Sequence, residues 1–256
     1  MRLSFARVSA YRRCPYQYRL AWIEKVPPKS RPYTRLANAL HLALAAFHRG
    51  KAPTSPDAPQ EPSLATLLDL YRRAWTGRLT PFDRKQLAVG ESILRVYVQR
   101  LGSTMPNTIH VEAPFEIQLG PHVVYGRLDR VDETADGLDI VDYKTADTKI
   151  EPNTLQLDVY QLGLQALSGR LANRVAYYYL RSNERVEFVR GEADARRTRD
   201  LLVAAARELE SDWQLSPRPG PACVTCPYTA HCPAVNARPE PLPGRRAGDQ
   251  LRLELG

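Results

Sequence analysis

The stretch VYGRLDRVDETADGLDIVDYKT, residues 124–145, constrains the fold of this chain more than any other. Two runs of alternating apolar and polar residues flank the turn sequence TADG, a pattern that predicts a β-hairpin. Because successive strand side chains point to opposite faces, both turns that fit this sequence place Asp129, Asp142 and Lys144 on one face. Carboxylates that lie directly opposite each other repel strongly unless a cation separates them or one is protonated.

This acidic face has two interpretations. In the first, Mg²⁺ or Mn²⁺ takes oxygen ligands from Asp129 and Asp142, and Lys144 orients a metal-bound water or steadies charge on a phosphate. In the second, the hairpin lies on the surface and carries an ordinary Asp–Lys pair. A turn centred on Ala135-Asp136 pairs Asp129 with Asp142, whereas a turn centred on Asp136-Gly137 pairs Asp129 with Lys144.

Charge and length narrow the class of protein. The 256 residues suffice for one large domain, and 36 Lys and Arg against 28 Asp and Glu favour a polyanionic partner such as nucleic acid. A basic protein without such a partner would have the same balance. We find neither a secretory signal nor an apolar run of about 18 residues, so we expect no membrane association and a cytoplasmic location. Structural disulfides are rare there, which favours metal ligands or free core thiols for the four cysteines.

Hydrophobic periodicity predicts alternating helices and strands, and hence an α/β fold. Pro15 should break the first helix, and Asn153 or Thr154 should cap the helix that follows the hairpin. The sequence also has a Pro-rich connector at 50–63. The expected helices cover 5–25, 34–48, two segments of 64–102 split near Thr80-Pro81, 154–167 and 192–214, and the expected strands cover 109–119, 122–133, 138–144, 174–180 and 185–190.

Three further motifs accompany the hairpin: SAYRRCPYQYRL near the N-terminus, ANALHLAL around His41, and QLDVY from Gln156 to Tyr160. Taken alone, a histidine between two leucines is typical of a core, and Gln156 and Tyr160 would form a polar helix edge. Together with GRLDRVD and IVDYKT, which lie between ANALHLAL and QLDVY, they resemble the RecB-like nucleases of the PD-(D/E)XK superfamily. The motifs follow the order expected of that family, and the resemblance spans residues 4–233. One departure is that Asn38 and Ala37 stand where that family often has a glycine.

The resemblance implies a mixed sheet flanked by helices, an N-terminal helical part, and metal-dependent hydrolysis of DNA phosphodiester bonds. We expect a single nuclease domain over residues 1–233, a helical insertion at about 50–105, and a tail at 234–256. By family analogy the activity is that of an exonuclease on single-stranded DNA ends, in repair or CRISPR spacer acquisition, with protein partners from a repair or spacer-acquisition complex. A structure-specific or nicking endonuclease and a non-catalytic DNA-binding subunit of a repair complex are the alternatives.

The resemblance also assigns site residues. Lys144 would position the attacking water, and Gln156 and Tyr160 would help to hold the nearby DNA strand. Glu112 could contribute as the acid at the start of the preceding strand. The expected ligands of Mg²⁺ or Mn²⁺ are His41, Asp129, Asp142 and the carbonyl of Tyr143. Phosphate contacts are expected from Arg12, Arg13 and Arg127. The alternative is that these arginines are solvated surface charge without such a role.

The cysteines form a separate pattern. Cys223, Cys226 and Cys232 have the spacing C-x₂-C-x₅-C, and Cys14 lies 209 positions before Cys223. Three are followed by proline, as in iron–sulfur sequences, whereas zinc usually takes two C-x₂-C pairs; zinc and free thiols stay open on the residues alone. In the iron–sulfur branch of RecB-like nucleases, which includes the CRISPR-adaptation exonucleases and the AddB nuclease domain, this arrangement holds a 4Fe–4S cluster. The resemblance therefore implies an iron–sulfur lobe built from residues near 14 and from 223–233.

Overall fold

The computed structural model of the chain describes residues 1–29, 33–49, 63–102, 105–146 and 154–236. The chain divides into two compact units, one of Met1–Phe5 with Arg31–Val203 and one of Ala6–Ser30 with Ala204–Gly256. Most of the predicted connector at 50–63, most of the tail and Asn153 lie outside the described residues. Within the described ranges, no helix is both long and apolar enough to cross a membrane.

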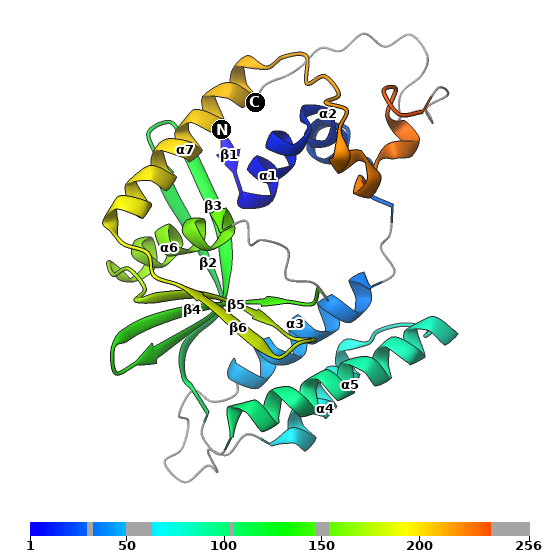
Figure 1. Cartoon of the computed structure of the whole chain (residues 1–256), viewed down its shortest axis with the longest axis vertical. Coiled ribbons are helices and arrows are strands. Elements are labelled where there is room, and N and C mark those ends of the chain that lie inside the picture. The colour runs from blue at the N-terminus through cyan, green and yellow to red at the C-terminus, as the bar shows by residue number, and fades with distance from the viewer. Residues whose placement is uncertain (30–32, 50–62, 103–104, 147–153, 237–256) are drawn as a thin grey trace. The chain divides into compact units, whose positions relative to one another are not determined.

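The first unit is built on a mixed β-sheet, as predicted (Figure 1). The strand order is β1-β3-β4-β5-β6, and β2 pairs with the other edge of β3. The pairs β1–β3 and β4–β5 are parallel, and the other pairs are antiparallel. The strands are β1 Arg2–Leu3, β2 Asn107–Leu119, β3 His122–Thr134, β4 Gly137–Lys144, β5 Arg174–Tyr179 and β6 Glu184–Phe188.

The predicted hairpin is β3 and β4. Arg130 pairs with Val141, and Thr134 pairs with Gly137, so Ala135-Asp136 is the centre of the turn. This is the first of the two possible registers, and extending it by one residue brings Asp129 level with Asp142. Because side chains alternate, Arg130 and Val141 occupy the opposite face of the sheet.

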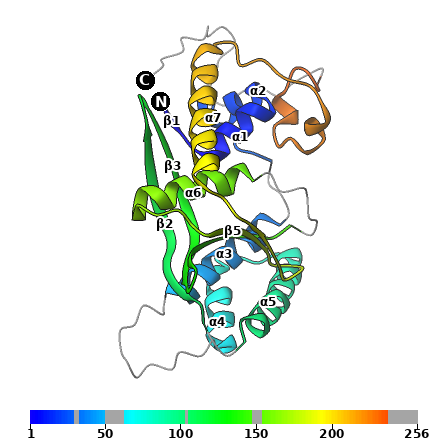
Figure 2. The same cartoon turned by 60° about the vertical axis from the view of Figure 1, so that its left-hand side comes forward.

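Helices cover both faces of this sheet (Figures 1 and 2). On one side α3 (Thr34–Arg49), α4 (Leu64–Ala74) and α5 (Pro81–Leu101) form a core with Val141 and Tyr143 of β4. On the other side α6 (Leu155–Ser168) contacts β2, β3, β4 and β5. The predicted split near Thr80-Pro81 is confirmed, because a capping box of Thr80 and Asp83 starts α5 with Pro81 in its first turn.

Two glycines allow α6 to lie close to the sheet. The ring of Phe115 on β2 packs between Gly126 of β3 and Gly163 of α6. A Cβ atom would lie 2.5 Å from this ring at Gly126 and 2.6 Å at Gly163, well inside van der Waals contact. Tyr160, one turn before Gly163, packs edge-on against Phe115 with the ring centroids 6.1 Å apart. The glycine of the YGRLDR motif therefore has a packing role.

The second unit joins segments from both ends of the chain. The predicted first helix breaks at Pro15, which begins α2 (Pro15–Tyr18) after α1 (Phe5–Arg13), and a π-helical turn follows at Arg19–Ile23. The helix α7 (Glu192–Ser211) contributes its last residues, and 3₁₀ turns follow at Pro221–Thr225 and Thr229–His231. The two segments meet in a small core of Leu20, Val26 and Tyr228, and the Tyr11 hydroxyl donates to Asp212 at 3.1 Å.

Candidate active site

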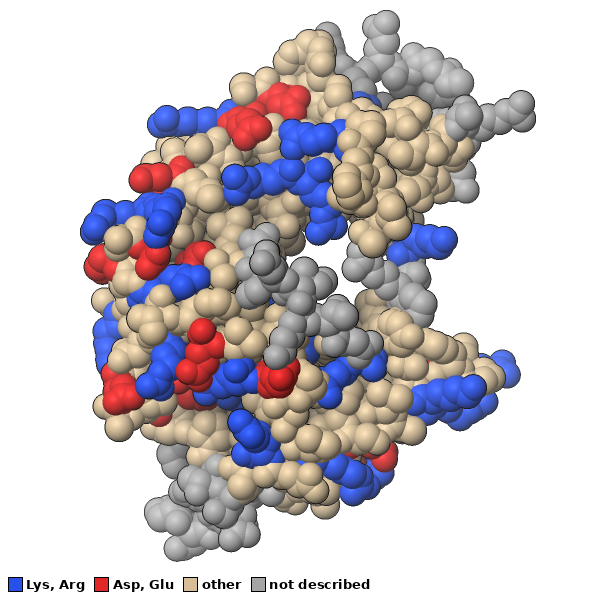
Figure 3. All heavy atoms as spheres, viewed as in Figure 1, with Lys and Arg blue, Asp and Glu red and all other residues tan. Residues whose placement is uncertain are grey.

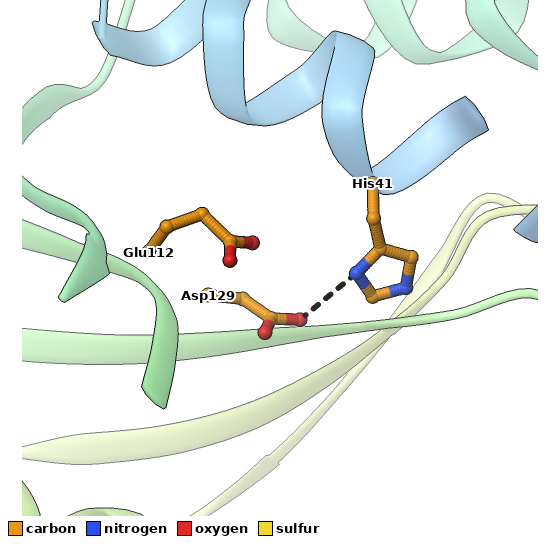
Figure 4. A group of neighbouring side chains, drawn as sticks. All are labelled: His41, Glu112 and Asp129. Carbon is orange, nitrogen blue, oxygen red and sulfur yellow. Dashed lines mark ion pairs between the residues drawn. The ribbon is translucent and has the colours of Figure 1, made fainter. Parts of the chain in front are cut away.

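Three side chains from α3, β2 and β3 converge in the first unit (Figure 4). One ligand atom each from His41, Glu112 and Asp129 lie within 4.8 Å of one another, and all three residues are half-buried. His41 Nδ1 lies 3.4 Å from Asp129 Oδ2. Two carboxylates and an imidazole are a donor set that suits a divalent cation such as Mn²⁺ or Mg²⁺.

Glu112 enters this group through an unusual backbone conformation. Its φ of +50° lies in the left-handed region, although it stands inside strand β2. Such a conformation costs a non-glycine residue roughly 1–3 kcal/mol and is found mostly at functional sites. The neighbouring residues Val111 and Ala113 pair with Arg130 and Leu128, so Glu112 lies level with Asp129. A single sequence contains no indication of this distortion. The sequence alone therefore gives less support to Glu112 as a site residue than to the other candidates.

Asp142 and Lys144 begin a chain of polar contacts that runs from β4 to α6. The buried Asp142 forms an ion pair with Lys144, with Oδ2 and Nζ 2.6 Å apart. Lys144 also donates to Gln156 Oε1 at 2.7 Å, and Gln156 Nε2 donates to the Tyr160 hydroxyl at 2.9 Å. The structure therefore brings these four predicted residues together, although Asp142 is not a member of the group around His41.

Burial and mutual repulsion make the ionised forms of the two carboxylates unfavourable in this site. Burial, followed by repulsion from Asp142, raises the pKa of Asp129 to about 8, against a lowering contribution from the Tyr143 N–H, which donates to Asp129 Oδ2 at 3.1 Å. Burial also raises the pKa of Asp142 and lowers that of His41. A bound cation would favour the ionised carboxylates and the neutral imidazole, so these residues fit a metal ion.

A buried polar network lies on the opposite face of the hairpin. Arg130 is 4% exposed; its Nη1 donates to the hydroxyls of Tyr97 and Tyr143 at 2.7 and 2.6 Å, and its Nη2 lies 2.9 Å from Asp132 Oδ2. His48 Nε2 lies 3.0 Å from the same Nη1. His48 Nε2 also lies 2.7 Å from the Tyr97 hydroxyl, so the histidine is connected to the network through two of its members.

This Arg130 network joins β3 and α3, which carry Asp129 and His41 of the metal group, to α5 and β4. His48 lies seven residues after His41 on α3, Tyr97 lies on α5, and Tyr143 separates Asp142 from Lys144 on β4. Through these contacts Arg130 fixes α3 against the hairpin, and with it the distance from His41 to Asp129. This network was not predicted; its signals in the sequence are the parity of Arg130 and the two-turn spacing of His41 and His48 on α3.

The four cysteines lie in the second unit. All four line one pocket, and none forms a disulfide. The Arg218 N–H donates to Cys14 Sγ at 3.3 Å, and burial raises the pKa of Cys226, with further contributions from the other three thiols. Across the described residues, however, no three of these sulfurs lie within 4.8 Å of one another.

The arginines proposed for phosphate contacts have different surroundings. Arg127 lies 3.2 Å from Glu112 in an exposed ion pair beside the metal group. Arg13 lines the cysteine pocket, and the backbone carbonyl of Arg12 accepts a hydrogen bond from the Arg218 side chain at 2.8 Å. Of the three, Arg127 is the one that contacts a candidate metal ligand.

Comparison with known proteins places the chain in a family. No curated protein matches it significantly. Among solved structures, SSO0001 has 17% sequence identity and a TM-score of 0.37, covering 78% of this chain and 85% of that one. An exonuclease candidate from Eubacterium rectale has 12% identity and a TM-score of 0.44, covering 82% of each chain. At these TM-scores the assignment depends on the sequence profile of the PD-(D/E)XK nuclease superfamily, which matches residues 2–233. The chain therefore belongs to the PD-(D/E)XK nuclease superfamily.

Proposed function

We propose that this protein hydrolyses phosphodiester bonds of DNA with Mg²⁺ or Mn²⁺, as an exonuclease that acts on single-stranded ends. The observation that carries the proposal is the convergence of His41, Glu112 and Asp129, in a member of a nuclease superfamily, next to a lysine anchored by Asp142. The two groups lie together because Asp129 and Asp142 are level on neighbouring strands.

The residues divide the chemistry between them. His41, Glu112 and Asp129 would hold the divalent ion, with Asp142 and the carbonyl of Tyr143 as further candidate ligands. The ion, when bound, polarises a phosphoryl oxygen and lowers the pKa of a coordinated water. Holding the ion at this position leaves the adjacent lysine on the hairpin face to act on the substrate.

Lys144 is suited to position the attacking water and to stabilise negative charge on the phosphate. Its ammonium is held from two sides, at 2.6 Å by Asp142 and at 2.7 Å by Gln156, and Tyr160 in turn holds Gln156. A preorganised cation next to the reacting phosphate needs no rearrangement during the reaction. Gln156 and Tyr160 would also border the DNA strand, because they lie on the same face of α6.

The anchored lysine favours catalysis over the second class of function, a DNA-binding subunit without activity. Binding alone would not require a lysine fixed by the buried carboxylate of Asp142. The preference for an exonuclease over an endonuclease of the same fold rests on family analogy. The same analogy supports a role in DNA repair or spacer acquisition, in the cytoplasm and with protein partners.

We further propose that Cys14, Cys223, Cys226 and Cys232 hold a 4Fe–4S cluster in the second unit, as part of one nuclease domain over 1–233. Their common pocket and the N–H donor to Cys14 support this. Four thiolates on one zinc at 2.3 Å would place their sulfurs about 3.8 Å apart, closer than the spread seen here. The cluster would join two segments separated by a very long loop.

The test is digestion of end-labelled linear and circular single-stranded DNA with Mg²⁺ or Mn²⁺. We expect the linear strand to shorten from an end while the circle survives, and Lys144→Ala to lower the rate by about 100-fold or more with DNA binding retained. Lys29→Ala, which removes an exposed lysine, is the matched control.

Each other outcome identifies an alternative. Cleaved circles would indicate an endonuclease, and DNA binding without cleavage by the unaltered protein would indicate the non-catalytic subunit. Full activity of Lys144→Ala would contradict the role of that lysine. Asp129→Ala should be inactive, so any cleavage measured in its preparation gives the background from contaminating nucleases.

A further inference from the structure

Two exposed aromatic rings lie against each other near the candidate active site. Tyr33, directly before α3, is 52% exposed, and Phe82, in the first turn of α5, is 40% exposed. Their ring centroids are 5.8 Å apart, and the guanidinium of Arg181 lies 5.5 Å from the Tyr33 ring. Among the large hydrophobic residues exposed in the described ranges, Trp213 is the one other aromatic, so two of three share one contact.

This pair is connected to the candidate active site by two routes. Arg181 Nε donates to the carbonyl of Thr145 at 3.0 Å, and Thr145 directly follows Lys144. The second route is α3 itself, because His41 lies eight residues after Tyr33. Eight residues correspond to about 12 Å of helix rise. The rings therefore lie beside the end of β4 that carries Lys144, at a short distance along α3 from the metal group.

The surface next to the rings is strongly basic. Each acid between residues 64 and 101 is ion-paired: Asp69 with Arg73, Asp83 with Arg35, and Glu91 with Arg72. In Figure 3 most of the charged side chains in the region of α5 are Lys and Arg, on a surface that is otherwise largely uncharged. Five cations of this stretch form no ion pair with a described residue: Arg78, Arg84 and Lys85, close to Phe82 in sequence, and Arg95 and Arg100, about 20 Å or more further along α5. Such a surface attracts a polyanion to the rings.

We propose that Tyr33 and Phe82 form a stacking platform for an unpaired base of a single-stranded DNA substrate. Aromatic rings interleaved with cations are the usual means by which proteins hold single strands without reading their sequence. A base inside a duplex already has both faces stacked, so the platform selects unpaired nucleotides. This inference rests on the proposed nuclease function and adds a strand preference to it.

The geometry also limits where the stacked base lies. Stacked nucleotides rise by roughly 3.4 Å each, so 12 Å along α3 corresponds to at most about four nucleotides between the metal group and the platform. Arg181, which links the Tyr33 ring to Thr145, is placed to contact the phosphates between the two. The base on the platform is therefore one close to the bond that is cut.

The experiment uses single-stranded oligonucleotides that carry the fluorescent base 2-aminopurine at successive positions. They are titrated with Lys144→Ala protein in Mg²⁺, so that binding is measured without cleavage. We expect quenching at one or two adjacent positions, and its loss together with at least about fivefold weaker binding in Tyr33→Leu and Phe82→Leu. Tyr33→Phe keeps the ring and should behave like the parent.

Val96→Ala is the matched control, because Val96 is an exposed apolar residue on the same helix as Phe82, about 21 Å further along it. Equal binding by the Leu variants and this control, or no binding of the single strand by the parent, would overturn the proposal. Ring-dependent quenching, together with no cleavage of DNA by the protein that keeps Lys144, would overturn the proposed function alone. Cleavage by a protein whose Tyr33 and Phe82 variants bind normally would overturn the platform alone.

Discussion

The contact of Gly163 with Phe115 leads to a quantitative prediction about a residue outside the candidate site. Substitution of Gly163 by alanine would place a Cβ atom 2.6 Å from the Phe115 ring, and restoring an ordinary contact of 3.4 Å needs a movement of about 0.8 Å. The ring cannot move away, because its other side packs against Gly126 of β3. That contact is so close that a Cβ atom on Gly126 would lie 2.5 Å from the ring. The movement must therefore come from α6.

A shift of α6 by this amount affects the lysine. The bond from Lys144 to Gln156 would lengthen from 2.7 Å to about 3.5 Å, which is the limit for a hydrogen bond. Loss of a hydrogen bond to a charged group is worth about 1.5–3 kcal/mol, so we expect the rate of DNA hydrolysis to fall by about tenfold or more. Overpacking of the core should lower the free energy of unfolding by about 1–3 kcal/mol.

The assay combines urea unfolding with single-turnover hydrolysis of labelled DNA. Gly191→Ala is the matched control, since nothing lies within 4 Å of the added Cβ there. Phe115→Leu, introduced together with Gly163→Ala, should give α6 room to return and restore part of the rate. A Gly163→Ala protein with normal rate and stability would refute the reasoning, and so would a double variant that regains stability but no activity.

Three further predictions concern the charges and thiols of the two units. Because the pKa of Asp129 is raised to about 8, the metal-free protein binds a proton there that the unfolded chain releases near pH 4. Its stability in urea should therefore fall from about pH 4 to about pH 8 while its affinity for Mn²⁺ rises, and flat profiles would contradict this. Arg130→Met leaves the buried Asp132 without its ion-pair partner and should lower the free energy of unfolding by about 3–5 kcal/mol. Adding Asp132→Leu should restore stability in urea but not the affinity for Mn²⁺, measured by calorimetry. Recovery of the Mn²⁺ affinity in the double variant would show that the network does not position His41. Protein purified without oxygen should be brown and contain iron near four per chain if it holds the cluster, and Cys14→Ser should lose both properties. One zinc per chain in the unaltered protein would disprove the cluster.

Much of the hairpin could be derived from its sequence. Alternation placed Asp129 on the same face as Asp142 and Lys144 in either register, and the structure has the register centred on Ala135-Asp136. Parity holds for either turn because side chains alternate along both strands and the two turns shift the pairing by two residues, which leaves every side chain on the same face. The choice between the two turns could not be made, because both are compatible with the same local residues.

The rest of the site depends on contacts that a single sequence does not contain. Glu112 joins the metal group because β2 adopts a left-handed backbone there, which the surrounding fold imposes on a residue that does not favour it. Arg130 reads as surface charge beside a hairpin, yet helices α3 and α5 bury it completely under tyrosines. Long-range packing decides both positions, and periodicity is a local property.

The construction of the second unit from both chain ends has a consequence for synthesis on the ribosome. Cys14 is made before Cys223, Cys226 and Cys232, which follow 209 to 218 residues later, so the pocket that all four line cannot form until then. At roughly 5–20 residues per second, this interval lasts on the order of 10–40 s. During that time the first unit can fold on its own contacts while the thiol of Cys14 is exposed to oxidants. The order of synthesis therefore lets the first unit, which ends at Val203, be completed before the cysteine pocket can assemble.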